Sequence, residues 1–199
     1  MIPASDKSIL RQSIRNQIRK ARRALSPRQQ ADAASAVGSR LLAHPRVAVA
    51  KTLALFLSFD GELDTRPIIE ALRQRGQQVY LPVLHPFSPG HLLFLCYEAD
   101  TPLVFNRLRI REPKLDVTGL LPLAQLDVLF TPLVAFDADG RRLGMGGGFY
   151  DRTLQYRRRE SGFYPIGLAH DCQQVDEVPD EPWDIPLPEI ITPSRHWQW

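Results

Sequence analysis

Short apolar runs that alternate with helix-forming stretches constrain the fold of this 199-residue chain more than any other feature. Six runs have the length and composition of buried β-strands: 52–57, 78–83, 92–96, 126–130, 164–169 and 189–192. Helices are predicted at 6–25, 26–42, 67–75 and 149–159. Because strands that alternate with helices form crossover units, we predict an α/β fold with one mixed, largely parallel sheet flanked by helices. Ligands of such sheets bind beyond the carboxyl ends of the strands.

The bulk composition predicts where such a chain works. Its two cysteines, Cys96 and Cys172, are too few for a disulfide framework and have no metal-binding spacing, which is typical of a reducing compartment. No apolar run is long enough to span a membrane, and the N-terminus lacks the apolar core of a signal peptide. We therefore expect a cytoplasmic monomer without membrane association, formed as a single domain over 1–199 with the basic helix 1–25 packed on it.

Four of the five residues in Gly144–Gly148 are glycines, and charged residues flank them. Glycines cluster in this way where backbone amides must approach a ligand closely or where φ is positive. Successive amides, followed by the N-terminus of a helix, form a site for an anion. Arg141, Arg142 and Arg152 would add full charges, and Asp151 is able to hold a metal ion on phosphate oxygens. The alternative is a glycine-rich turn on a charged surface.

Charge is unevenly distributed along the chain. Residues 1–30 hold eight Lys or Arg and one Asp, whereas the whole chain has a net charge of +3. Lys7, Arg11, Arg15 and Arg19 are spaced by four, which places them on one ridge of the predicted helix. The ridge is compatible with a solvated helix face, with a small polyanionic ligand or with a nucleic-acid-binding arm.

The segment 56–65 follows a predicted buried strand, which is where an α/β sheet places its ligands. The carboxylate of Glu62 is suited to accept two hydrogen bonds from an amidine-like edge of a flat heterocycle. The alternative is that Gly61 only turns the chain. Asp64 or Thr65 is predicted to cap the helix that begins near Pro67.

The remaining histidines and tryptophans carry weaker information. The five histidines are scattered, without the local spacing of a zinc site, and we therefore expect no zinc. Trp183, Trp197 and Trp199 are expected to pack in the protein rather than to form the wall of a ligand site.

The strings Thr131–Asp137 and Gly140–Arg152 closely resemble those of the 5-formyltetrahydrofolate cyclo-ligase family, also called 5,10-methenyltetrahydrofolate synthetases. The resemblance runs nearly from end to end. It includes Lys7, Arg11 and Arg15 at one end, the segments 56–65 and 110–113, and Asp184 with 190–192 at the other. It implies a fold similar to that of sugar-phosphate isomerases and CoA transferases.

The resemblance also implies a reaction. Members of this family use ATP and Mg²⁺ to close 5-formyltetrahydrofolate into 5,10-methenyltetrahydrofolate, with release of ADP and phosphate. The formyl oxygen is a poor leaving group until it is phosphorylated, after which the N10 amine attacks and phosphate departs. Such a reaction needs alignment and charge neutralisation rather than a nucleophilic side chain. The expected ligands are ATP, Mg²⁺ and a folate whose tail carries one or more glutamates. Binding of nucleic acid is not expected.

Roles for individual residues follow from the resemblance alone. The positions for ATP are Lys7, Arg11, Arg15, Arg142, Leu143, Gly144, Met145, Gly146, Gly147, Gly148, Phe149 and Tyr150. The positions for the folate are Arg11, Leu57, Glu62 and Tyr150. Arg142 and Tyr150 are implied to act in catalysis, and Asp151 and Asp184 to hold Mg²⁺.

The chain departs from the family pattern at four positions. Trp183 replaces a usual His, Pro188 a usual Asp, and Phe149 a usual Tyr, while Met145 stands where Tyr or a basic residue is common. Because Arg142, Asp151 and Glu62 are retained, we expect an active enzyme. Three alternatives stay open: a non-catalytic folate or ATP binder, an ATP-independent enzyme of the same broad fold, and a nucleic-acid-binding module built on 1–30.

Overall fold

The structure, a computed structural model, describes residues 4–159 and 162–199. Its helices are α1 (Ala4–Arg23), α2 (Pro27–Leu42), α3 (Pro45–Val49), α4 (Arg66–Gln74) and α5 (Phe149–Arg159). The strands of the main sheet are β1 (Thr52–Ala54), β2 (Gln78–Leu84), β3 (Leu92–Cys96), β6 (Val128–Pro132), β9 (Tyr164–Leu168), β10 (Glu189–Ile191) and β11 (His196–Gln198). Two small hairpins are formed by β4 (Leu103–Phe105) with β5 (Arg111–Pro113), and by β7 (Ala135–Phe136) with β8 (Arg142–Leu143).

The main sheet is largely parallel, as predicted. Its strand order is β11-β10-β9-β6-β1-β2-β3. Strands β10, β9, β6, β1 and β2 run in parallel, whereas the edge strands β3 and β11 are antiparallel to their neighbours. The carboxyl ends of the inner strands therefore meet at one edge of the sheet.

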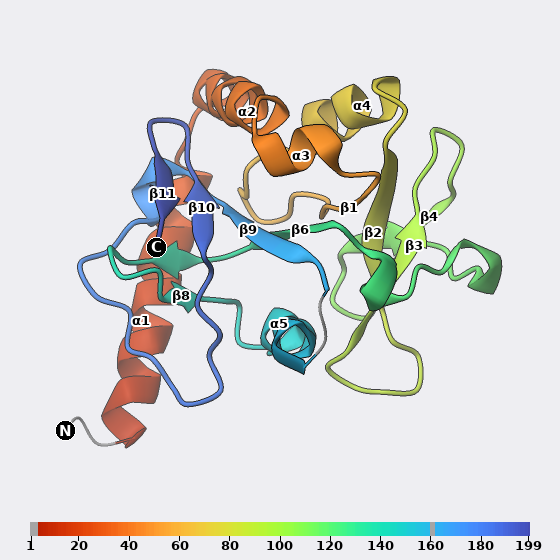
Figure 1. The fold of residues 1–199 in the computed structure, drawn as a ribbon. Helices are drawn as coiled ribbons and strands as arrows, with labels where there is room; N and C mark the ends of the chain where they lie inside the picture. Colours follow the sequence, from red (N-terminus) through yellow and green to blue (C-terminus); the bar gives the residue numbers. More distant parts are fainter. Residues whose placement is uncertain (1–3, 160–161) are drawn as a thin grey trace.

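Helices cover both faces of this sheet, with α2, α3 and α4 on one side and α5 on the other (Figure 1). Successive residues of a strand point to opposite faces, so both sets must be apolar. Leu53 packs into the core beneath α2 and α4, whereas its neighbour Ala54 belongs to the core that includes Leu154 of α5. This arrangement explains why the strands read as continuous apolar runs.

The predicted helix ends are confirmed where local chemistry sets them. The Ser26 side chain accepts a hydrogen bond from the Gln29 amide, the Gln29 side chain accepts one from the Ser26 amide, and Pro27 opens α2. Helix α3, strand β11 and the two small hairpins were not predicted, because elements of two to five residues carry too little periodicity.

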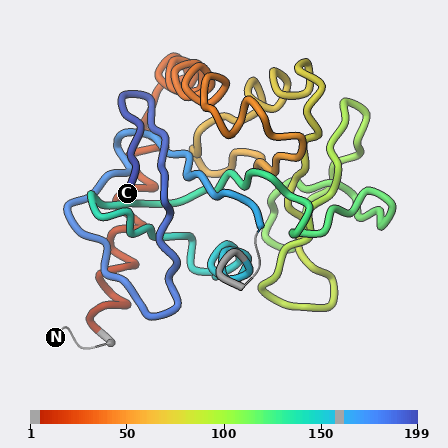
Figure 2. Tube along the Cα trace, in the orientation of Figure 1, coloured from red at the N-terminus to blue at the C-terminus, as the bar shows by residue number. Residues whose placement is uncertain are grey.

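Helix α1 lies across the end of the sheet and makes apolar contacts on one side and polar contacts on another. Ile14 and Ile18 pack with a small core cluster that contains Val134 and Leu143. The segment 175–188 runs beside the N-terminal half of α1, as the chain trace in Figure 2 shows. Among the described residues, no helix is long and apolar enough to cross a bilayer.

Candidate active site

A cavity of about 1020 Å³ opens at the carboxyl ends of β1, β2 and β6. This is the edge of the sheet where the topology predicts a ligand. Two kinds of surface line it. One, which we call the charged wall, comprises Arg11 and Arg15 of α1, the segment 142–151 and residues 181–184. The other, the apolar wall, comprises residues 56–62, the ends of β2 and β3, and residues 106–112 of the β4–β5 hairpin.

The glycine loop of the charged wall leads directly into α5. Gly146 and Gly148 have φ of +100° and +67°, a backbone conformation that favours glycine. A Cβ atom at Gly147 would lie 2.6 Å from the ring of Phe149, so a side chain there would displace the ring or the loop. Because α5 begins at Phe149, the loop amides and the N-terminus of the helix lie at the cavity together. Such a loop is suited to hold an anionic group.

The basic ridge of α1 faces the protein rather than solvent. Arg11 forms a two-pronged ion pair with Asp184, with nitrogen–oxygen distances of 2.5 and 3.1 Å, and Arg15 Nε donates to Gly144 O at 2.8 Å. Lys7 Nζ donates to Asp180 O at 2.9 Å and lies beside the cavity rather than in the described lining. The ridge therefore joins α1 to both loops of the charged wall, and the interpretation as a solvated face is wrong.

Arg142 is the most deeply buried cation of the cavity. Its side chain is 2% exposed and its NH2 lies 2.5 Å from Asp151 Oδ1. Arg142 Nε has no hydrogen-bond partner among the described residues. Of the three arginines predicted around the glycines, only Arg142 lines the cavity: Arg141 pairs with Asp137 and Asp139, and Arg152 donates to Gly90 O and Gly147 O.

The two predicted metal ligands differ in how far their oxygens are already engaged. Asp151 accepts bonds from Arg142 and from the Ile185 amide through Oδ1 alone, at the first turn of α5. Both oxygens of Asp184 pair with Arg11, and Oδ2 also accepts from the Glu181 amide. A hard cation prefers carboxylate oxygens, so Asp151 fits such a ligand as it stands, whereas Asp184 fits only if Arg11 moves.

Glu62 lies on the apolar wall with its carboxyl group 12% exposed. Burial raises the pKa of Glu62 to about 7. The Phe59 amide donates to Glu62 Oε2 at 3.1 Å, and Arg22 lies 3.8 Å from Oε1, which is too far for a good hydrogen bond. Arg22 also pairs with Asp60, so it offsets only part of the cost of burying the Glu62 charge.

Tyr150 lies at the same cavity, near both Glu62 and Arg142. Burial raises the pKa of Tyr150 above its ordinary value, and the charge of Glu62 raises it further. The hydroxyl therefore stays protonated at neutral pH and is a hydrogen-bond donor rather than a base.

Beneath the apolar wall, Asp60 gathers three arginines of α1, namely Arg19, Arg22 and Arg23. Arg22 is fully buried and also donates to the Asp60 carbonyl oxygen. The segment that carries Glu62 is thus held against α1 by a buried charge cluster. No sequence pattern predicts this cluster, because Asp60 lies 37 to 41 residues from the three arginines.

Other predicted positions are distributed as follows. Leu57 lines the cavity, whereas the side chain of Leu143 is buried in the core cluster of α1. Thr65 is the N-cap residue of α4, but its side chain donates to Phe56 O and does not cap the helix. Asp64, one residue earlier, accepts from the Arg66 amide. Trp183 is 60% exposed and lines the cavity, so the packing prediction is wrong for it, while it is confirmed for Trp197, which packs on Phe136.

The remaining predicted positions for ATP all lie in the lining of the cavity: Gly144, Met145, Gly146, Gly147, Gly148 and Phe149. Sequence reasoning missed most of the apolar wall, including Leu84, Leu108 and Ile110. These residues come from separate segments and share no spacing, so only the fold brings them together.

The protein is therefore an α/β protein whose ligand cavity lies at the carboxyl ends of the parallel strands. A glycine loop suited to bind an anion and buried arginine–carboxylate pairs line this cavity. The sequence profile of the 5-formyltetrahydrofolate cyclo-ligase family matches residues 7–193. The chain belongs to this family.

Individual relatives agree with the family match. The chain is 59% identical to the 5-formyltetrahydrofolate cyclo-ligase of Escherichia coli K12 over 92% of its own length and 100% of that protein. It is 53% identical to the enzyme of the same name from Haemophilus influenzae, over 91% and 96% of the two chains. The NMR structure of the 5,10-methenyltetrahydrofolate synthetase of Aquifex aeolicus superposes with a TM-score of 0.79 at 27% identity, covering 95% of this chain and 92% of that one. The predicted fold and family are thereby confirmed.

Proposed function

We propose that the protein converts 5-formyltetrahydrofolate to 5,10-methenyltetrahydrofolate with ATP, releasing ADP and phosphate. The observation that carries this proposal is the meeting of two unlike walls in one cavity. The charged wall offers a glycine loop, a helix N-terminus and three arginines, which suit a polyphosphate. The apolar wall offers a mostly hydrophobic surface that includes the carboxyl group of Glu62, which suits a pterin.

The reaction needs charge neutralisation more than covalent catalysis. The γ-phosphoryl group passes to the formyl oxygen, the N10 nitrogen attacks the formyl carbon and loses its proton, and the oxygen leaves as phosphate. Arg142 and the loop amides are placed to neutralise the oxygens of the phosphoryl group during transfer. Tyr150, held protonated, is placed to donate a hydrogen bond to the same group or to the formyl oxygen.

The folate is assigned to the apolar wall. Glu62 accepts hydrogen bonds from the amidine-like edge of the pterin, and Leu57 packs against its ring. Arg11, which already neutralises Asp184, lines the cavity, where an anionic folate tail or a phosphate would contact it. Lys7 and Arg15, on the same ridge, extend the positive surface for ATP.

Asp151 is the residue that we assign to Mg²⁺, because one of its oxygens is not engaged by the hydrogen bonds to Arg142 and Ile185. Asp184 would become a second ligand if Arg11 left it to pair with a phosphate. The ion would supply Lewis-acid neutralisation of phosphate oxygens. We also propose that the protein acts as a monomer, which light scattering during size-exclusion chromatography measures.

The direct test is to incubate the purified protein with 5-formyltetrahydrofolate, ATP and Mg²⁺ and to follow the near-ultraviolet absorbance of methenyltetrahydrofolate. Reactions without ATP are the control. ATP-dependent product is the expected result. Product without ATP would favour an ATP-independent enzyme, and folate binding by a folded protein without product would favour a non-catalytic binder.

A further inference from the structure

A second polar cluster lies at the opposite edge of the sheet from the active-site cavity. His44 lies between α2 and α3, Glu189 opens β10 and His196 opens β11. Glu189 and its hydrogen-bond partner Tyr164 are the first residues of their parallel strands, so the cluster is at the amino ends, whereas the active-site cavity is at the carboxyl ends. A separate cavity of about 610 Å³ adjoins the cluster, and no described residue lines both cavities.

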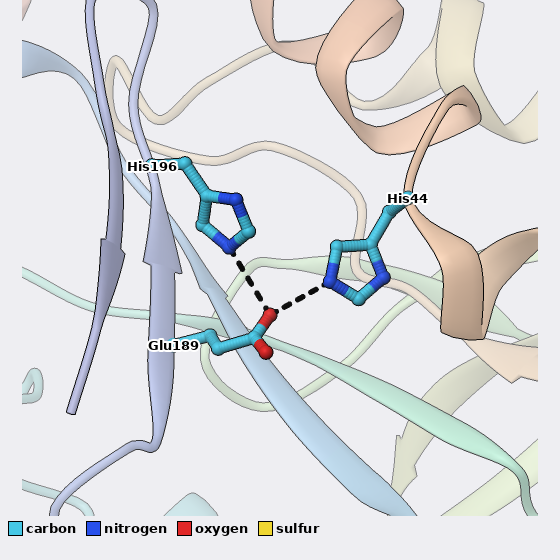
Figure 3. Close-up of side chains that lie close together, drawn as sticks. All are labelled: His44, Glu189 and His196. Carbon is cyan, nitrogen blue, oxygen red and sulfur yellow. Dashed lines mark hydrogen bonds and ion pairs between the residues drawn. The ribbon is translucent and has the colours of Figure 1, made fainter.

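The geometry of the cluster converges on one point. His44 Nε2 lies 2.8 Å and His196 Nε2 lies 3.2 Å from the same oxygen, Glu189 Oε2, and all three ligand atoms lie within 4.8 Å of one another. Figure 3 shows both imidazole rings directing these nitrogens at that oxygen. Ligand atoms of a tetrahedral zinc site with bonds of about 2.0–2.1 Å are roughly 3.4 Å apart. Small side-chain rotations would therefore bring the three atoms onto one ion.

The surroundings hold the carboxylate in place. Tyr164 OH donates to Glu189 Oε1 at 2.9 Å, and Gln198 Nε2 donates to it at 3.2 Å. Hydrogen bonds of this kind orient a metal ligand and leave the other oxygen for the ion. His44 and Glu189 are buried, at 6% and 7% side-chain exposure, whereas His196 is 29% exposed. His44 and Glu189 are thus enclosed by the protein, whereas His196 is partly accessible to solvent.

His44 Nδ1 is buried and has no hydrogen-bond partner among the described residues. An ion on Nε2 would leave the ring proton on Nδ1, and metal-bound histidines usually donate that proton to an acceptor. Metal binding at His44 therefore calls for a water molecule beside Nδ1.

Two arginines line the same cavity and are held at its sides. Arg40 donates to Pro193 O and Ser194 O, and the guanidinium of Arg46 lies 3.9 Å above the ring of Tyr164. Their charge opposes any cation at this cavity and favours an anion that accompanies a bound one. Any fourth ligand from solvent would thus be water, hydroxide or a small anion.

We propose that His44 Nε2, His196 Nε2 and Glu189 Oε2 form a site for Zn²⁺ or a similar divalent transition metal, with the fourth position open to the cavity. Two imidazoles and one carboxylate are a ligand set that zinc uses with an open position. The three residues are 7 to 152 positions apart, so the prediction of no zinc rested on local spacing that does not apply to them. The site is independent of the proposed reaction at the other edge of the sheet.

The test is to titrate the full-length, chelator-stripped protein with Co²⁺ in the absence of ATP and Mg²⁺, because Co²⁺ with few ligands absorbs visible light far more strongly than the hydrated ion. We expect one equivalent to bind with an intense band that Zn²⁺ abolishes. His196→Ala, which alters the least buried ligand, should weaken binding at least tenfold. Glu189→Gln keeps the size of the side chain and should do the same.

Two matched variants separate this site from other sources of binding. His85→Ala removes a histidine outside the cluster, and Asp151→Asn alters the active-site carboxylate; both should leave the Co²⁺ titration unchanged. Far-UV circular dichroism confirms that each variant is folded. Absence of the band in the wild-type protein, or equal binding by wild type and His196→Ala, would overturn the proposal.

Discussion

The two walls of the active-site cavity are built in opposite ways. On the charged wall, every cation is fixed by an ion pair or a carbonyl oxygen: Arg11 by Asp184, Arg142 by Asp151 and Arg15 by Gly144. On the apolar wall, mostly apolar side chains from separate segments line the cavity together with the buried carboxyl group of Glu62. The first wall is organised by charge before any ligand arrives, and the second by hydrophobic packing.

The difference predicts which kinetic constant each wall controls. Fixed charges cost little reorganisation when the phosphoryl group moves, so the charged wall should act mainly on kcat. Apolar surface binds the substrate and the transition state about equally, so the apolar wall should act mainly on KM. Arginine charges do not titrate near neutral pH, whereas Glu62 does, so the pH response should come from the apolar wall.

The largest expected effect is that of Arg142→Ala, which removes the buried cation of the charged wall. We expect kcat to fall about a thousandfold with little change in the KM for folate, because the lost interaction neutralises charge in transfer. Steady-state assays measure both constants. Arg141→Ala, at the neighbouring residue outside the cavity, is the matched control and should be near normal. A normal kcat for Arg142→Ala would show that the charged wall does not control kcat.

Asp151→Asn should change the response to Mg²⁺ next most strongly. We expect the Mg²⁺ concentration for half-maximal rate to rise about tenfold, because one carboxylate ligand is lost. The measurement is a Mg²⁺ titration at saturating ATP and folate. Asp139→Asn, which alters an exposed acid paired with Arg141, serves as the control. An unchanged titration would show that Asp151 serves only to position Arg142.

The dependence of the KM for folate on pH tests the role of Glu62 on the apolar wall. The pKa of Glu62 is raised to about 7, so its carboxylate form is lost as the pH falls from 8 to 6. The KM for folate should therefore rise about tenfold at pH 6, since only the carboxylate accepts both pterin hydrogen bonds. Glu62→Gln should raise the KM for folate at every pH and make it independent of pH. Glu70→Gln, which alters an exposed residue of α4, should retain the wild-type pH profile.

The same raised pKa has a consequence for stability with a definite sign. The folded protein holds the Glu62 proton more tightly than the unfolded chain, whose ordinary value is 4.5. The stabilisation from this proton is present below about 4.5 and is lost as the pH rises to about 7. Urea unfolding of the wild type and Glu62→Gln across this window should show that loss in the wild type alone.

The smallest expected effect is that of Leu108→Ala on the hairpin side of the cavity. Leu108 is 46% exposed without ligand, and its truncation should remove about 1 kcal/mol of apolar contact. We expect the KM for folate to rise about fivefold with kcat unchanged. Val104→Ala, an exposed residue of the same hairpin outside the cavity, is the control. A fall in kcat for Leu108→Ala would show that the walls do not divide the constants.

The sequence was most informative where chemistry is local. The Ser26 cap, the start of α5 at Phe149 and the glycines of the anion loop depend on neighbouring residues, and each was predicted. The sequence was least informative about which residues contact each other across the fold. The four-residue spacing of the α1 ridge indicated a shared face but not what that face contacts, because Asp184 and Gly144 are more than 100 residues away.

The strand–helix alternation, the anion loop and the family could be predicted from the sequence, because periodicity, glycine conformation and a long contiguous string are properties of neighbouring residues. Tertiary structure alone decided that Asp60 binds three arginines, that residues 106–112 complete the cavity, and that His44, Glu189 and His196 meet. These groups come from segments far apart in the chain. Their proximity is set by the register of the sheet and the packing of its helices, which no local pattern encodes.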